Sequence, residues 1–134
     1  MVAPTVLVAA EVDDGPAILV AMKAEHEFFA VDQVPWQVDP GAQTITERVL
    51  SRGEDDGTLT RIARWAPGTE TSAGVIRHDY YEEVYLLDGE LHDLTLGRTF
   101  TAGHYASRPP GMPHGPYRTE TGCAMLEIRY PPAR

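Results

Sequence analysis

Glycine and proline divide the second half of the chain into short segments, and this spacing limits the possible folds more than any other feature. Turn-forming residues recur from Gly57 to Gly122, among them the runs Pro67-Gly68 and Pro109-Pro110-Gly111. The segments between them are short and rich in apolar residues: 59–66, 83–87, 91–96, 105–108 and 124–130. Such segments indicate β-strands, and several at close spacing indicate a sandwich or a barrel. We therefore expect an all-β fold.

Alternation of side chains supports this reading in two of the segments. Residues 58–65 and 124–130 alternate roughly as half-buried strands should, with Leu126, Ile128 and Tyr130 on one face of the second. We also expect residues 44–50 to form the first strand of the barrel, after a loop over residues 35–41.

The first thirty residues follow a different pattern. Asp14 as an N-cap and Pro16 in a first turn favour a helix over residues 16–28, but Ile18, Leu19 and Val20 favour a strand nearly as well. Both alternatives stay open, and we expect residues 1–21 to form an appendage. We predict an N-terminal extension over 1–30, partly strand or helix, and a barrel domain over 31–134.

Length and charge restrict the kind of protein. A chain of 134 residues fits one domain, and 20 acidic against 11 basic residues give a net charge of −9. This balance argues against nucleic acids and anionic membranes as partners. Cys123 is the single cysteine, the N-terminus lacks a basic signal-peptide region, and no apolar run is long enough to span a bilayer. We expect a soluble, cytoplasmic protein.

Two motifs carry the chemistry. His78 and Glu82 precede Gly89, and Gly103 leads through Pro109-Pro110-Gly111 to His114. In this order and spacing the motifs resemble those of the cupin superfamily. Two positions depart from the pattern, because Ile76 stands where a first histidine is usual and Arg118 where an asparagine is usual.

The resemblance implies a single-domain cupin, which is a jelly-roll-type double-stranded β-barrel, with a divalent metal held by His78, Glu82 and His114. Two imidazoles and one carboxylate match the facial arrangement of non-haem iron(II) oxygenases. In one alternative these are the three protein ligands and Ile76 is an apolar wall. In another, His92 or His104 is a fourth ligand, and in a third the metal has been lost.

More specifically, the chain resembles ChrR-type cupins over roughly residues 30–130, and this resemblance rests on the strings 63–69, 78–89, 106–116 and Gly122-Cys123. That group includes a zinc-binding anti-sigma-factor domain, and small iron cupins that cleave carbon–carbon bonds are also similar. The resemblance favours an Fe2+-dependent dioxygenase acting on a diketone or hydroxyketone. The alternatives are a non-redox isomerase, cyclase or lyase using Zn2+, Ni2+ or Mn2+, and a metal-binding sensor or partner-binding module.

Other residues receive smaller roles. Tyr80 and Arg64 are candidates for contact with a small-molecule substrate, and only one of Arg61 and Arg64 can face inward on one strand. By the same alternation we expect Val84 and Leu86 to share the interior with Glu82. Cys123 is expected to be buried, and pairing through barrel edges predicts a homodimer.

Overall fold

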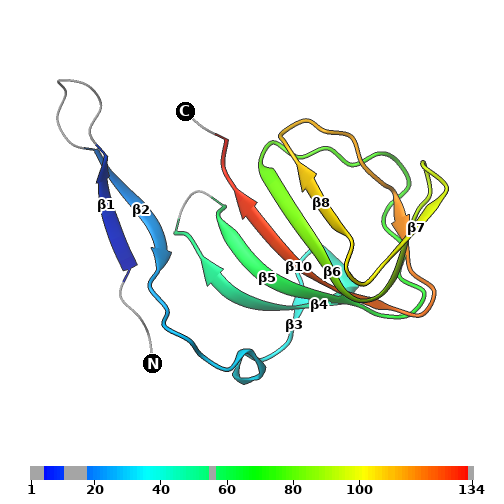
Figure 1. Cartoon of the computed structure of the whole chain (residues 1–134), viewed down its shortest axis with the longest axis horizontal. Helices are drawn as coiled ribbons and strands as arrows, with labels where there is room; N and C mark the ends of the chain where they lie inside the picture. The colour runs from blue at the N-terminus through cyan, green and yellow to red at the C-terminus, as the bar shows by residue number, and fades with distance from the viewer. Residues whose placement is uncertain (1–4, 11–17, 55–56, 133–134) are drawn as a thin grey trace.

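The computed structural model describes residues 5–10, 18–54 and 57–132, and within them it is built from strands (Figure 1). The elements are β1 (Thr5–Ala10), β2 (Ile18–Ala24), a 3-10 turn η1 (Val31–Gln33), β3 (Gln37–Asp39), β4 (Ala42–Arg52), β5 (Leu59–Trp65), β6 (Tyr81–Asp93), β7 (Arg98–Thr101), β8 (Tyr105–Arg108), β9 (Tyr117–Arg118) and β10 (Cys123–Tyr130). The all-β prediction is confirmed.

Eight strands form one curled antiparallel sheet in the order β3-β4-β5-β10-β6-β7, with β8 and β9 also paired to β6. The long strand β6 pairs with β10 and β8 through its first half and with β7 and β9 through its second half. The sheet therefore folds over on itself as a jelly-roll barrel (Figure 1).

The predicted break between segments 83–87 and 91–96 is wrong, because β6 continues through Gly89. Gly89 has a φ of 79°, and a Cβ there would overlap the carbonyl oxygen of Gly122. Glycine is needed at this position to bend the strand and to let the two backbones approach, not to end the strand.

The N-terminal extension is a two-stranded sheet of its own, β1 with β2, which lies beside the barrel (Figure 1). The helix alternative is wrong for residues 18–24, since Ile18 pairs with Ala10 and Val20 with Val8. Asp14 and Pro16 lie outside the described residues. The division at residue 30 stays a prediction.

Residues 44–50 form a strand as predicted and lie within β4, but they are not the first strand of the barrel, because β3 precedes β4 in the same sheet. The preceding loop prediction is partly wrong, because Gln37–Asp39 forms the short edge strand β3 against β4. Residues 105–108 and 124–130 fall in β8 and β10 as predicted.

One end of the barrel interior is apolar. Its buried side chains come from the five strands β4, β5, β6, β9 and β10: Ile45, Ala63, Trp65, Val84, Leu86, Leu91, Tyr117, Cys123 and Met125. Val84, Leu86 and Cys123 are therefore buried, as expected. The outer face of β10 carries Leu126 and Ile128, which are only partly buried.

The other end of the interior is ionic, which the sequence analysis did not foresee. Two residues along from the apolar positions, the inner face carries Glu47, Arg61, Glu82 and Glu127, all at most 7% exposed. The sheet register places Arg61 opposite Glu127, Arg129 opposite Glu82, and Glu82 opposite Arg108. Opposite charges face each other across neighbouring strands, the arrangement that stabilises such pairs.

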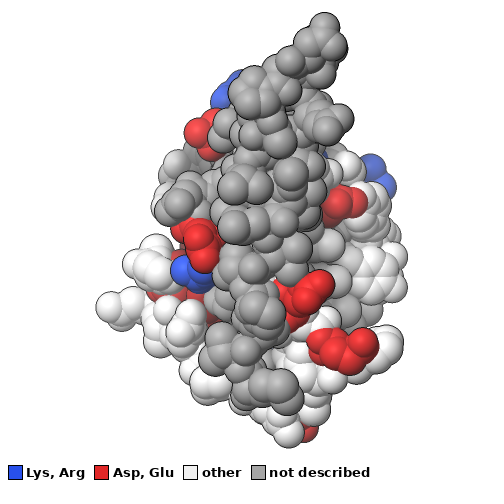
Figure 2. Space-filling view, turned by 90° about the vertical axis from the view of Figure 1, so that its left-hand side faces the viewer, with Lys and Arg blue, Asp and Glu red and all other residues white. Residues whose placement is uncertain are grey.

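Outside the barrel, acidic side chains are prominent on the face shown in Figure 2, in keeping with the net charge of −9. The described residues contain no helix that is long and apolar enough to cross a membrane. The predicted cytoplasmic location and homodimer stay predictions.

Candidate metal centre

His78, Glu82 and His114 meet at the boundary between the apolar and ionic ends of the barrel. One ligand atom from each side chain lies within 4.8 Å of the others. Glu82 is the second residue of β6, His78 precedes that strand by three residues, and His114 follows β8. The backbones of Ile76 and His114 exchange two hydrogen bonds of 2.7 and 3.0 Å, which bring the two histidine segments together.

The state of His114 tests whether this group fits a metal. Its Nε2 atom is buried and has no hydrogen-bond partner among the described residues. Burial, together with the nearby Arg108 and His78, lowers the pKa of His114 to about 4. Burial also lowers the pKa of His78. Both imidazoles are therefore neutral at pH 7, which is the form of histidine that binds a divalent ion. The unpaired Nε2 of His114 is the atom that would donate to the ion.

Tyr117 holds His114 from the other side. The Tyr117 hydroxyl lies 3.1 Å from Nδ1 of His114 and accepts a 2.8 Å hydrogen bond from Nη2 of Arg108. The phenol oxygen can also accept from an Nδ1–H of His114, and this tautomer leaves the Nε2 lone pair free. Metal-binding histidines generally donate their second ring nitrogen in this way. Tyr117 was missed, although it follows His114 by only three residues.

Glu82 is ionised and paired with two arginines. Its carboxylate accepts a 2.8 Å hydrogen bond from Nη1 of Arg108 and one of 3.2 Å from Nε of Arg129. Its other neighbour is Nε2 of His78, at 3.7 Å. Burial raises the pKa of Glu82, but the two guanidinium groups outweigh it and the net shift is downward. Neither arginine was a predicted site residue.

The two predicted substrate-contact residues differ in outcome. The ring of Tyr80 stacks on His78 with centroids 4.5 Å apart, so it lies against the candidate metal centre. The placement of Arg64 is a correction, because its side chain is exposed and its guanidinium lies 4.0 Å from the centre of the Trp36 ring. Arg61 is the inward-facing arginine of β5, and Asp39, Glu47 and Glu127 hold it.

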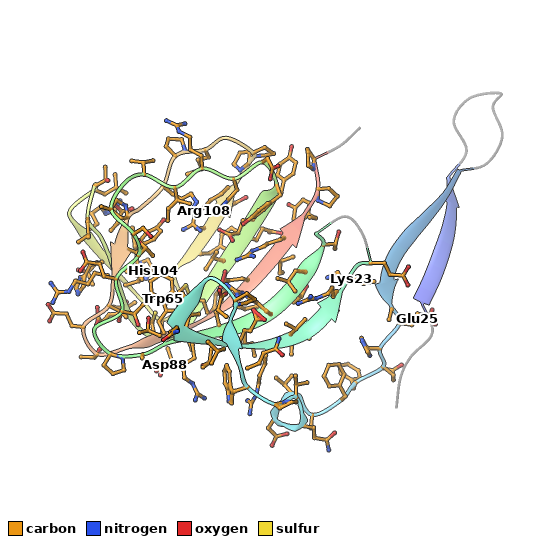
Figure 3. The ribbon with its side chains drawn as sticks, turned by 180° about the vertical axis from the view of Figure 1, so that it is seen from behind. Lys23, Glu25, Trp65, Asp88, His104 and Arg108 are labelled. Atoms are coloured by element: carbon orange, nitrogen blue, oxygen red, sulfur yellow. The ribbon has the colours of Figure 1, made fainter. Side chains whose placement is uncertain are left out.

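The alternatives for a fourth ligand find no support among the described residues. His92 pairs with Glu90 at 2.7 Å and with Thr99 at 2.6 Å, and it does not join the cluster. His104 lies at the end of the β7–β8 turn (Figure 3). It is exposed, and its Nδ1 atom lies 2.8 Å from the carbonyl oxygen of Thr101. Ile76 lines the same cavity as the three clustered side chains, as the three-ligand alternative requires.

A curled antiparallel barrel with two histidines and a glutamate at this position defines the class as cupin. Residues 24–131 match the family described as the ChrR Cupin-like domain, so the chain belongs to that family. A search of curated proteins found no match.

Solved structures show the same fold. An RmlC-like cupin from Shewanella frigidimarina superposes with a TM-score of 0.64 at 22% identity, covering 84% of this chain and 96% of that one. An acetylacetone dioxygenase from Acinetobacter johnsonii has a TM-score of 0.64 at 18% identity, covering 80% and 74%. The polyketide cyclase RemF from Streptomyces resistomycificus has a TM-score of 0.59 at 23% identity, covering 82% and 84%.

Proposed function

We propose that this protein is a metal-dependent enzyme and that its chemistry is that of a non-haem iron(II) dioxygenase acting on a small oxygenated carbon compound. The observation that carries the proposal is the orphaned Nε2 of His114 beside His78 and Glu82. Two neutral imidazoles and one carboxylate are the donor set typical of such enzymes. The likeness to an acetylacetone dioxygenase is in keeping with a diketone-type substrate.

A divalent ion bound by these residues would act as a Lewis acid and template for substrate oxygens, and Fe2+ would also allow reaction with dioxygen. The protein's own groups have separate tasks. Tyr117 orients His114, while Arg108 and Arg129 keep Glu82 ionised and offer positive charge to a substrate oxyanion. Ile76 and Val84 line the cavity and limit access of water.

A second candidate is a non-redox lyase, isomerase or cyclase. It is favoured by the paired guanidinium groups of Arg108 and Arg129, which lie within hydrogen-bonding distance of Glu82 and would stabilise an enolate without any oxidant. The likeness to a polyketide cyclase is in keeping with this chemistry.

Oxygen uptake separates the two candidates. Protein reconstituted with Fe2+ is expected to consume oxygen with at least one member of a panel of β-diketones and hydroxyketones, and His114→Ala should abolish the uptake. His92→Ala, a histidine outside the cluster, should retain it. Substrate turnover that proceeds equally well under nitrogen with Zn2+ would overturn the dioxygenase proposal in favour of the second candidate.

A further inference from the structure

A second cavity lies against the metal centre and has a different lining. Its volume is about 400 Å3, and it shares Arg108, His114 and Tyr117 with the cavity that holds the triad. Its other walls are mostly apolar, and we call it the side chamber. These walls include Val75, Leu96, Phe100, Ala106, Met112 and Pro113.

The rim of the side chamber is unusually apolar for a surface. Leu96 is 60% exposed, Val75 is 51% exposed and Met112 is 42% exposed. Apolar side chains that gather around a concavity of this size mark a ligand site more often than scattered exposed residues do. The chamber is therefore suited to the apolar body of a small molecule.

The inner end of the chamber carries positive charge, because a series of alternating charges, buried or partly buried, ends there. This series, which we call the ionic chain, consists of Arg61, Glu127, Arg129, Glu82 and Arg108, each paired with the next. Arg61 also holds Asp39 and Glu47, so each member before Arg108 has opposite charge on both sides. Among the described residues, Arg108 has Glu82 on one side and only the neutral hydroxyl of Tyr117 on the other.

Asp93 also lines the chamber with a carboxylate, which affects the pKa values of His114 and Tyr117 less than Arg108 does. Its Oδ1 atom accepts hydrogen bonds of 3.0 and 2.9 Å from the backbone N–H groups of Thr95 and Leu96. It thereby shapes the turn that carries Leu96. A divalent ion on Glu82 would further increase the positive charge beside Arg108.

We propose that the side chamber binds an amphiphilic monoanion, with its apolar body between Leu96 and Met112 and its anionic oxygen against Arg108. The inference rests on the proposed function in taking this ligand as the substrate of the metal centre. It adds the requirement that the substrate carry both an apolar body and a negative charge at the reacting end.

Three simple probes test this requirement by titration calorimetry on the full chain loaded with Zn2+. Hexanoate should bind about 10-fold more tightly than hexanamide, since a charge-assisted hydrogen bond contributes that much. Hexanoate should also bind at least about 10-fold more tightly than acetate, because its additional methylenes leave water. Equal affinity for hexanoate and hexanamide, or for hexanoate and acetate, would overturn the inference.

Two matched variants locate the binding. Leu96→Glu places a charge on the chamber rim and should lower the affinity for hexanoate about 10-fold or more. Leu94→Glu makes the same change two residues away, at a side chain that is 47% exposed and is not part of the chamber lining. It should bind hexanoate as the unaltered protein does, and equal losses in both variants would count against the chamber.

Arg108 is tested by Arg108→Gln and Arg108→Lys. The first should remove the preference for hexanoate over hexanamide, and the second should restore part of it because the charge returns. Zinc content is measured on every sample. Unaltered protein that holds zinc without preferring hexanoate refutes the chamber and leaves the proposed function standing. Unaltered protein that takes no zinc yet prefers hexanoate refutes the proposed function and supports the chamber.

Discussion

The two ends of the barrel interior are built from the same strands but are held together by different forces. On each of four neighbouring strands, one inward position is apolar and the next inward position is charged: Ile45 and Glu47, Ala63 and Arg61, Met125 and Glu127, and Val84 and Glu82. At the apolar end, burial of hydrocarbon surface is the main stabilising term. At the ionic end, each buried charge depends on a partner from the next strand.

The register of the strands therefore matters most at the ionic end. The apolar end would tolerate many side chains of similar volume. The ionic end is stable only when Arg61 faces Glu127 and Arg129 faces Glu82, as the observed pairing provides. The candidate metal centre lies where the two ends meet, so the carboxylate of Glu82 belongs both to the series of paired charges and to the candidate ligand set.

The largest effect should come from breaking the ionic end at Arg61. Arg61→Met leaves Asp39, Glu47 and Glu127 without their shared partner, and we expect a loss of about 4 kcal/mol in the free energy of unfolding. Arg64→Met on the same strand removes only an exposed stack on Trp36 and should cost about 1 kcal/mol or less. Urea unfolding measures both, and equal losses would contradict the contrast.

At the apolar end, Leu86→Ala should cost about 3 kcal/mol, because it opens a cavity around a side chain that is 3% exposed. Leu87→Ala, next to it and 43% exposed, should cost less than about 1 kcal/mol. Urea unfolding of both variants is measured in low and in high salt, because salt screens charges but does not weaken the burial of hydrocarbon. The loss in Leu86→Ala should not depend on salt, and a marked salt dependence would show that the two ends are not separate.

A smaller effect is expected where the two ends meet. Tyr117→Phe removes the hydroxyl beside Nδ1 of His114 and should weaken Zn2+ binding by about 10- to 100-fold. Tyr105→Phe also removes a hydroxyl, one that donates to Glu83 on the exposed outer face, and should leave zinc affinity unchanged. Competition with a chromogenic chelator gives both values. An unchanged affinity in Tyr117→Phe would show that the hydroxyl does not orient His114.

The smallest effect concerns Cys123 in the apolar end, which should not react at all. Burial raises the pKa of its thiol to about 12, so the nucleophilic thiolate is absent from the folded protein at pH 8. Mass spectrometry should find no alkylation by iodoacetamide in the native state and full alkylation in urea. The thiol of the unfolded protein ionises at a lower pH than the buried thiol. Raising the pH through that lower pKa should therefore destabilise the fold. Rapid alkylation of the native protein at pH 8 would mean that this end is open.

The fold and the clustering of His78, Glu82 and His114 could be predicted from the sequence because their signals are local. Turn residues mark the ends of the strands, and few positions of sequence separate His78 from Glu82 and Gly103 from His114. Gly89 shows the limit of this approach, since its role depends on the backbone of Gly122, which is distant in sequence. A glycine that permits close approach looks like a glycine that ends a strand.

The ionic chain could not be predicted for the same reason. Arg61 and Glu127 are partners across 66 positions of sequence, and their pairing depends on the register of β5 against β10. Alternation reduced the choice to Arg61 or Arg64 but could not tell which face of the strand is inside. Likewise, residues 18–24 form a strand because β1 supplies a partner, which local propensity does not reveal.

The most direct test of the proposed metal centre is the metal content of protein purified without chelator and without an affinity-column metal. Elemental analysis should find one divalent ion per chain in the unaltered protein and in His92→Ala, and none in His114→Ala. A metal-free native protein that also fails to bind added Zn2+ or Fe2+, or a His114→Ala variant that retains its ion, would contradict the claim that His78, Glu82 and His114 form a metal centre.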